Sequence, residues 1–185
     1  MYLETRKEGT IMKHSRYERA VNFLHQIASF ISDWNNYFSI TEGIKHFNSS
    51  KSRKVQYASG MTRYCMITSD YVIKWDKTSE KDEYWTRKFG GVHSEIAFYE
   101  IACNDNREYL FAEAQGYNFN GIEFEIMPRV SYLGMDKGVE ACDAFDEDDW
   151  DYITSHVFDV HDENFGYLHG SPVVIDYAST YMARC

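Results

Sequence analysis

The sequence predicts an α+β fold, because strand-like segments alternate along the chain with segments of helical periodicity. Runs rich in β-branched and aromatic residues, in which every second residue shares the same character, are typical of strands. Such runs occupy residues 54–67, 70–75, 121–130 and 173–175. Steps of three and four residues between apolar side chains, which indicate helices, occur in residues 16–38, 94–102 and 150–158.

The longest helical pattern lies near the N-terminus. Apolar residues between Ala20 and Phe38 predict one amphipathic helix of about six turns over residues 16–38. Residues 39–53 are polar and rich in Ser and Lys, which predicts a connector, and residues 1–15 are expected to be frayed. We therefore expect an N-terminal helical extension, 1–50, packed as an accessory on a domain spanning 51–185, with homodimerisation through the helix as the alternative.

The segment around residues 157–177 carries the residues most suggestive of chemistry. Asn164 follows Asp159 by five residues, and Asp176 ends the apolar run Val173–Ile175. Phosphoryl transfer needs one carboxylate to orient the attacking hydroxyl, and an amide oxygen and a second carboxylate to hold Mg²⁺ against the phosphates. Asp159, Asn164 and Asp176 could fill these roles in that order. Taken without the Asp176 strand, the Asp159–Asn164 spacing is far more typical of an acidic loop between two strands than of a catalytic site.

A second candidate group lies upstream. Lys74 is embedded in the β-branched segment 70–75, where a Lys held by a carboxylate can reach the α- and β-phosphates of a nucleotide. Glu95 lies in the first turn of the predicted helix, with Ser94 as its expected N-cap. We prefer Glu95 to Glu100 as the partner of Lys74. The alternative for Glu95 is an ordinary carboxylate favoured by the helix dipole.

These segments together resemble the protein-kinase-like fold, and specifically the small kinase-like proteins of tailed bacteriophages. The resemblance covers roughly residues 52 to 180 and rests on Val72-Ile73-Lys74, Glu95, Asp159–Asn164 and Ile175-Asp176, in that order. The D-x-H-x-x-N loop is closer to phage kinases and to antibiotic or choline phosphotransferases than to eukaryotic kinases. The resemblance implies two lobes: an antiparallel N-lobe sheet with one helix, about 51–130, and a much reduced C-lobe, about 131–185.

The resemblance also implies where ATP would bind. The strand–turn–strand pattern of residues 54–67 stands where protein kinases have a glycine-rich loop, with Gly60 as its glycine and Arg63 as added positive charge. A lone glycine is equally expected in any hairpin. The last N-lobe strand would be residues 121–130, with backbone groups around Glu125 and Met127 pairing with adenine. The implied cofactors are ATP and Mg²⁺.

Composition narrows the class of protein. With 185 residues, 44% of them hydrophobic, the chain can bury a substantial core. Its formal net charge of −10 argues against nonspecific nucleic-acid binding, and no apolar run approaches the roughly 18 residues of a membrane span. Four cysteines without C-x-x-C spacing favour reduced thiols in a cytoplasm.

The expected function is that of an ATP- and Mg²⁺-dependent phosphotransferase, a small phage protein kinase that modifies host proteins in the bacterial cytoplasm. Two alternatives within the kinase-like class are a small-molecule phosphotransferase and a catalytically weak binding protein that acts on a host factor by contact. The reduced C-lobe favours the binding protein, whereas the intact set of Lys74, Asp159, Asn164 and Asp176 favours catalysis. A third alternative is a metal-dependent hydrolase with His and Asp ligands, drawn from His156, His161 and His169 and the adjacent Asp159 and Asp162.

Overall fold

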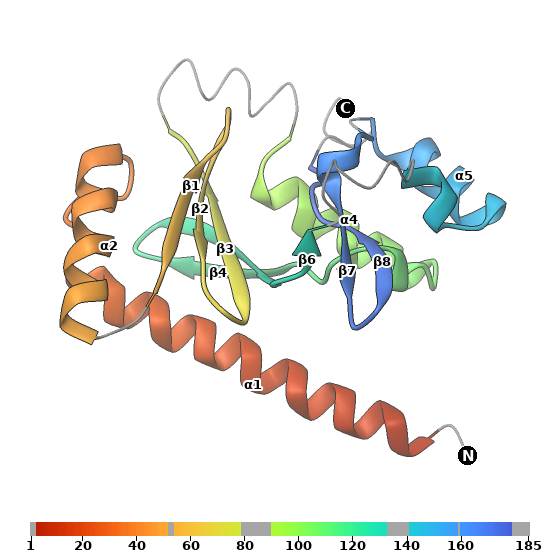
Figure 1. The fold of residues 1–185 in the computed structure, drawn as a ribbon, viewed down its shortest axis with the longest axis horizontal. Coiled ribbons are helices and arrows are strands. Elements are labelled where there is room, and N and C mark those ends of the chain that lie inside the picture. The colour runs from red at the N-terminus through yellow and green to blue at the C-terminus, as the bar shows by residue number, and fades with distance from the viewer. Residues whose placement is uncertain (1–2, 52–53, 79–89, 133–140, 159, 179–185) are drawn as a thin grey trace.

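The fold is α+β, as predicted. The computed structural model describes residues 3–51, 54–78, 90–132, 141–158 and 160–178, which hold four α-helices, an antiparallel five-stranded sheet and a smaller three-stranded sheet (Figure 1). The helices are α1 (Leu3–Ala28), α2 (Tyr37–Lys51), α4 (Val92–Asn104) and α5 (Glu147–His156). Within these ranges no helix is both long and apolar enough to cross a membrane.

The large sheet contains the strand with Lys74 at its centre. Its order is β1 (Gln56–Ser59), β2 (Arg63–Ile67), β3 (Tyr71–Asp76), β5 (Ile122–Pro128) and β4 (Gln115–Phe119). All neighbouring strands are antiparallel, and Lys74 of β3 lies opposite Cys65 on one side and Glu125 on the other. The expected strand–turn–strand, Lys strand and last N-lobe strand are therefore confirmed as secondary structure.

Alternation along the strands gives the sheet two chemically different faces. On β3, Ile73 and Trp75 are fully buried on one face, and Lys74 points to the opposite face. The apolar face is covered by α1 and α2, which contact β3, β5 and β1 (Figure 1). The core shared by these two helices and this face is formed by Ala20, Phe23, Leu24, Ile27, Ile31, Trp34, Ile40, Ile44, Phe47, Val55, Tyr64, Met66, Tyr71, Ile73, Trp75, Phe124 and Ile126.

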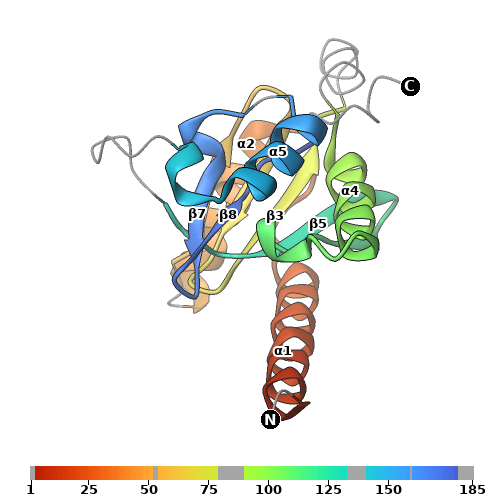
Figure 2. The same ribbon diagram turned by 90° about the vertical axis from the view of Figure 1, so that its right-hand side faces the viewer.

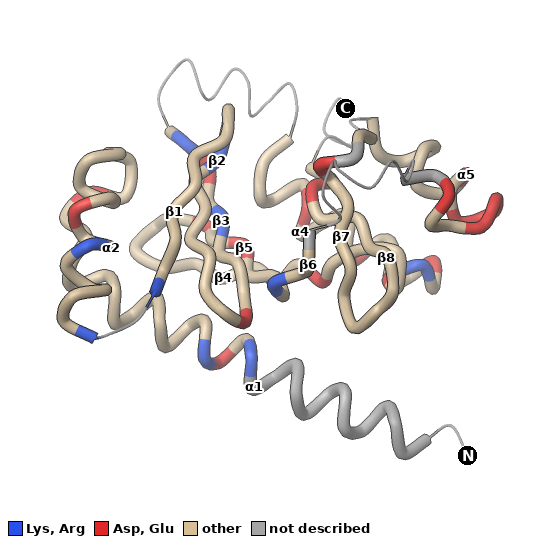
Figure 3. Tube along the Cα trace, in the orientation of Figure 1, with Lys and Arg blue, Asp and Glu red and all other residues tan. Residues whose placement is uncertain are grey.

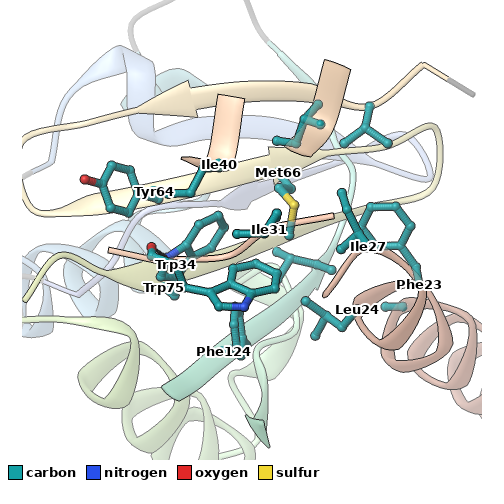
Figure 4. Close-up of a cluster of buried hydrophobic side chains, with 14 of the residues drawn as sticks. Phe23, Leu24, Ile27, Ile31, Trp34, Ile40, Tyr64, Met66, Trp75 and Phe124 are labelled. Atoms are coloured by element: carbon teal, nitrogen blue, oxygen red, sulfur yellow. Dashed lines mark hydrogen bonds between the residues drawn. The ribbon is translucent and has the colours of Figure 1, made fainter. Parts of the chain in front are cut away.

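An aromatic group joins the helices to the sheet (Figure 4). The ring centroid of Trp34, in the turn after α1, lies 5.5 Å from that of Trp75 on β3 and 5.2 Å from that of Phe124 on β5. The Trp75 indole N–H also donates to the Trp34 carbonyl at 3.0 Å. The expected packing of the N-terminal segment against the sheet is therefore confirmed.

The predicted single helix over residues 16–38 is wrong, as is the connector that was expected after it. α1 begins at Leu3, in the segment expected to be frayed, and ends at Ala28, and residues 39–51 belong to α2. The Asn36 side chain accepts from the backbone N–H groups of Phe38 and Ser39, at 2.9 and 3.2 Å, and so caps α2. Apolar periodicity continued through the turn because Ile31 and Trp34 are buried there too.

The opposite face of the sheet is covered by α4, which contacts β3, β4 and β5 (Figure 2). The expected N-cap at Ser94 is wrong, because α4 begins at Val92 with Gly91 in the N-cap position. Gly91 has no side chain to cap the helix, and the Asp76 carboxylate accepts from the Val92 N–H instead, at 3.2 Å. The last residue of β3 therefore anchors the start of the helix that carries Glu95.

The C-terminal part of the chain forms the small sheet and α5. The sheet order is β6 (Ser131–Tyr132), β7 (Phe165–Leu168) and β8 (Ser171–Val174), and short 3₁₀ turns occur at η1 (Glu108–Leu110), η3 (Ala141–Ala144) and η4 (Asp162–Asn164). α5 starts with acidic residues (Figure 3) and ends at His156, instead of continuing to Phe158 as the helical spacing of residues 150–158 predicted. These elements share a second core with α4, which includes Phe98, Phe111, Ile153, Phe165, Val174 and Tyr177.

Candidate functional site

The predicted ion pair between Lys74 and Glu95 is confirmed. The Lys74 ammonium donates to Glu95 Oε2 at 2.9 Å, and the two side chains are almost completely buried, with 8% and 0% of their surfaces exposed. The pair forms because β3 turns Lys74 towards the face that α4 covers, while Glu95 lies in the first turn of α4. Glu100, the alternative partner, is exposed on the same helix.

Glu95 is the centre of a larger network. Its Oε2 atom also accepts from Arg63 Nη1 of β2 at 2.5 Å, and its Oε1 atom accepts from the backbone N–H of Tyr177 at 2.8 Å. Burial acts to raise the pKa of Glu95, but the cations Arg63 and Lys74 outweigh it and lower the pKa to about 2. Glu95 is therefore ionised and links β2, β3, α4 and the segment after β8.

The same network reaches the proposed metal ligands. Lys74 donates to the Ile175 carbonyl at 3.0 Å, next to Asp176, and Arg63 Nη2 donates to Asp176 Oδ1 at 2.5 Å. The Ile175 N–H donates to the Asn164 carbonyl at 2.8 Å, which continues the β7–β8 pairing past Phe165. Asn164 and Asp176 therefore lie at the same end of the hairpin, close to the Lys74–Glu95 pair.

One sequence-predicted residue, Asp159, lies outside the described residues. The chain is described again from Val160, and η4 brings Asn164 to the start of β7. The structure therefore unites Lys74, Glu95, Asn164 and Asp176, whereas the role of Asp159 stays a prediction from the sequence.

The sheet gives no support to the predicted pairing of adenine with backbone groups around Glu125 and Met127. The Arg129 N–H donates to the Asp70 carbonyl at 3.0 Å, one residue beyond the Tyr71–Pro128 pair that ends the β3–β5 ladder. Because hydrogen-bonding pairs alternate along an antiparallel strand, Met127 and Glu125 also direct their N–H and C=O groups to β3. Both residues are engaged inside the sheet, and neither backbone is free to meet a base.

The Glu125 side chain lies in the network instead. It is fully buried, 3.6 Å from the Lys74 ammonium and beside the Glu95 carboxylate, to which a protonated Glu125 can donate a hydrogen bond. Burial, together with the nearby charge of Glu95, raises the pKa of Glu125 well above its usual range. A protonated Glu125 leaves two cations, Lys74 and Arg63, balanced by the two anions Glu95 and Asp176.

This raised pKa predicts a pH-dependent gain in stability for Glu125→Gln. A carboxyl whose pKa is raised in the folded state stabilises the fold fully when the pH is below its pKa in the unfolded state, about 4.3. This stabilisation is lost as the pH rises from there to the pKa in the folded state. Glutamine does not ionise, so we expect Glu125→Gln to keep this stabilisation. The difference in free energy of unfolding in favour of the variant should grow by at most about 1.4 kcal/mol per pH unit. Urea unfolding between pH 4.5 and 8 measures it.

The matched control for this experiment is Glu123→Gln, because Glu123 lies on the same strand with its side chain one-third exposed. It should show no comparable trend with pH. An advantage of Glu125→Gln that stayed constant from pH 4.5 to 8 would contradict the protonation assigned to Glu125.

The structure also revises the expected role of Gly60. Its backbone N–H donates to the Arg63 carbonyl at 2.9 Å across the β1–β2 turn, and its own carbonyl accepts from the Lys77 ammonium at 2.6 Å. A Cβ at this position would meet only ordinary contacts. The Gly60 N–H is therefore part of the hairpin and does not point at a ligand.

Sequence reasoning missed the central position of Arg63 and the contribution of Tyr177. Arg63 was expected only to add charge near the turn, yet it bridges Glu95 and Asp176. Strand alternation carried a signal for it, since Arg63 and Cys65 share a face of β2 and Cys65 lies opposite Lys74. Tyr177 contacts Glu95 through its backbone N–H, and a pattern of side chains in the sequence cannot predict such a contact.

The histidines proposed for a metal-dependent hydrolase lie in different places. His156 ends α5 and packs on Phe98 and Tyr152, whereas His169 is exposed in the tight β7–β8 turn, at the end of the hairpin opposite Asn164. In the part of the chain that is described, no three His, Cys, Asp or Glu residues are placed to hold a metal ion. The hydrolase hypothesis gains no support from this arrangement.

No protein-family model matches this sequence, and no curated protein matches it. A functional proposal therefore depends on the residues of this chain alone.

Proposed function

We propose that the protein is an ATP- and Mg²⁺-dependent phosphotransferase of the kinase type, a small phage protein kinase that modifies a host protein in the bacterial cytoplasm. The observation that carries the proposal is the buried ion pair between Lys74 of β3 and Glu95 of α4. Protein kinases use a strand Lys paired with a helix Glu to hold the phosphates of ATP. A buried pair of this kind is costly unless it has further hydrogen bonds, and here Glu95 has them.

The remaining roles follow from the positions around this pair. Lys74 would bind phosphate oxygens, with Glu95 as the positioning residue that holds the ammonium. Asp159 would orient the acceptor hydroxyl and take its proton. Hydrogen bonds from Tyr177 to Glu95 and from Lys74 to Ile175 keep the segment around Asp176 beside the phosphate-binding Lys.

The donor set at the end of the β7–β8 hairpin fits Mg²⁺. Asn164 offers an amide oxygen and Asp176 a carboxylate, which are hard oxygen ligands of the kind Mg²⁺ prefers. Asp176 is 43% exposed, so its carboxylate can be reached from solvent. Asn164 and Asp176 would hold the Mg²⁺, which would supply positive charge to neutralise the phosphates.

We expect the protein to bind a non-hydrolysable ATP analogue at least about tenfold more tightly with Mg²⁺ than without it. Asp176→Asn should remove most of this dependence, because an amide is a weaker ligand for a hard cation. Calorimetric titration with and without Mg²⁺ measures both effects. Asp151→Asn, an exposed carboxylate of α5, is the matched control and should behave as wild type.

Equal affinity in the presence and absence of Mg²⁺, or no binding at millimolar nucleotide, would contradict the proposed function. Specific observations then favour a kinase-like protein that acts on a host factor by contact. Arg63 already occupies the Asp176 carboxylate, and the Gly60 N–H is engaged in the hairpin.

A further inference from the structure

Arg63 holds two carboxylates of different character with the two arms of its guanidinium. Nη1 donates to Glu95, whose side chain is fully buried, and Nη2 donates to Asp176, whose side chain is 43% exposed. These partners lie 32 and 113 residues away along the chain. One arm is therefore anchored in the interior, and the other meets a carboxylate that solvent and ligands can reach.

The two carboxylates that Arg63 contacts differ in how many other hydrogen-bond donors they have. Glu95 also accepts from Lys74 and from the Tyr177 N–H. Asp176, by contrast, has Arg63 as its sole hydrogen-bond partner among the residues that the structure describes. If the Nη2 arm changed partner, the Nη1 arm would still hold the guanidinium in place, only 11% exposed, beside Lys74.

The site also needs a second phosphate-binding group. The turn between β1 and β2 does not offer the Gly60 N–H, which donates to the Arg63 carbonyl. A guanidinium presents a planar fork of donors that matches the oxygens of a phosphate. Arg63 starts β2, directly after this turn, and its guanidinium shares the Glu95 Oε2 atom with the Lys74 ammonium, the expected phosphate-binding group.

We propose that Arg63 is a phosphate-binding residue of the site, and that Asp176 occupies its second arm only while no nucleotide is bound. The proposal rests on the proposed function. On nucleotide binding, the Nη2 arm exchanges the Asp176 carboxylate for a phosphate oxygen, which frees the carboxylate to serve as a metal ligand. Without nucleotide, the same arm competes with a cation for Asp176.

The proposal predicts effects of opposite sign for Arg63→Gln. Without nucleotide, Mn²⁺ should bind about fivefold more tightly than to wild type, because its competitor for Asp176 is gone. Without metal, ATP should bind about tenfold more weakly or worse, because a charged hydrogen bond to phosphate is lost. Electron paramagnetic resonance of free Mn²⁺ measures the first constant, and calorimetry measures the second.

The control is Arg129→Gln, an exposed arginine at the far end of the β3–β5 pairing, which should change neither constant. Arg63→Gln combined with Asp176→Asn should lose the tighter Mn²⁺ binding. If Arg63→Gln does not fold, Arg63→Lys takes its place with the same expected signs, because Lys keeps a cation against Glu95 but has no second arm.

Weaker binding of both Mn²⁺ and ATP would give Arg63 a purely structural role and overturn the proposal, as would an unchanged Mn²⁺ affinity. Failure of the proposed function is distinguishable from this result. If wild type bound no ATP, but Arg63→Gln gained an Mn²⁺ site that required Asp176, the phosphotransferase would be excluded. The competition between Arg63 and a cation would then still be established.

Discussion

Replacing Glu95 by alanine should lower the free energy of unfolding by about 3–5 kcal/mol, the cost of leaving a buried charge without its partner. Glu95 compensates Lys74 and Arg63, which are 8% and 11% exposed, and it accepts the Tyr177 N–H. The substitution therefore strips two cations and one backbone donor of their acceptor at once. Urea unfolding at neutral pH measures the loss.

Glu100→Ala is the matched control, because Glu100 lies one and a half turns further along α4 and is exposed. It should change stability by no more than about 0.5 kcal/mol. Glu95→Gln, which keeps the shape and one acceptor oxygen, should fall between the two. A loss for Glu95→Ala no larger than that for Glu100→Ala would show that the network does not support the fold.

The pKa of Glu95 adds a pH dependence to this result. Its folded value of about 2 lies below an unfolded value of about 4.3. The stabilisation is therefore fully present above the unfolded value and is lost as pH falls through this window. Wild type should lose stability between about pH 4.3 and 2 more steeply than Glu95→Gln does, when the two are compared at equal ionic strength.

Asp159→Asn should reduce phosphoryl transfer by at least about a hundredfold and leave ATP binding unchanged, as expected for a general acid–base group. Asparagine keeps the size of the side chain and much of its hydrogen bonding, but it removes the charge that takes the hydroxyl proton. Labelled ATP supplied to the protein alone and to host lysate reports autophosphorylation and transfer. Calorimetry with the ATP analogue reports binding.

The control for this variant is again Asp151→Asn, which should transfer phosphate as wild type does. Loss of both binding and transfer in Asp159→Asn would move Asp159 from proton transfer to nucleotide binding. A wild-type protein that transfers phosphate to no acceptor, and whose effect on the host survives Asp159→Asn, would establish the kinase-like binding protein instead.

Local patterns were sufficient for four of the five strands of the large sheet, all but β4, and for the Lys74–Glu95 pair. Alternation in residues 70–75 and 121–130 predicted β3 and β5, since burial of one strand face imposes a period of two. The same alternation placed Lys74 on the face opposite Ile73 and Trp75. Glu95 could be chosen over Glu100 because the first turn of α4 points back towards β3.

Local patterns failed where a tertiary contact replaced a local one. Ile31 and Trp34 enter the core from the turn between α1 and α2, so apolar spacing continues through it and only its polar residues, such as Asp33 and the capping Asn36, marked the break. The start of α4 was misplaced because Asp76, from another element, caps it in place of a neighbouring side chain.

The sequence by itself determined the α+β class, the faces of the strands and the order of Lys74, Glu95, Asn164 and Asp176 along the chain, because each follows from short-range periodicity and residue chemistry. Only the tertiary structure decided that Arg63 bridges Glu95 and Asp176, and that Glu125 is buried beside Lys74 and Glu95. Such partners lie tens of residues apart. The packing of α4 and the β7–β8 hairpin against one sheet face brings them within bonding distance, and no local pattern records that distance.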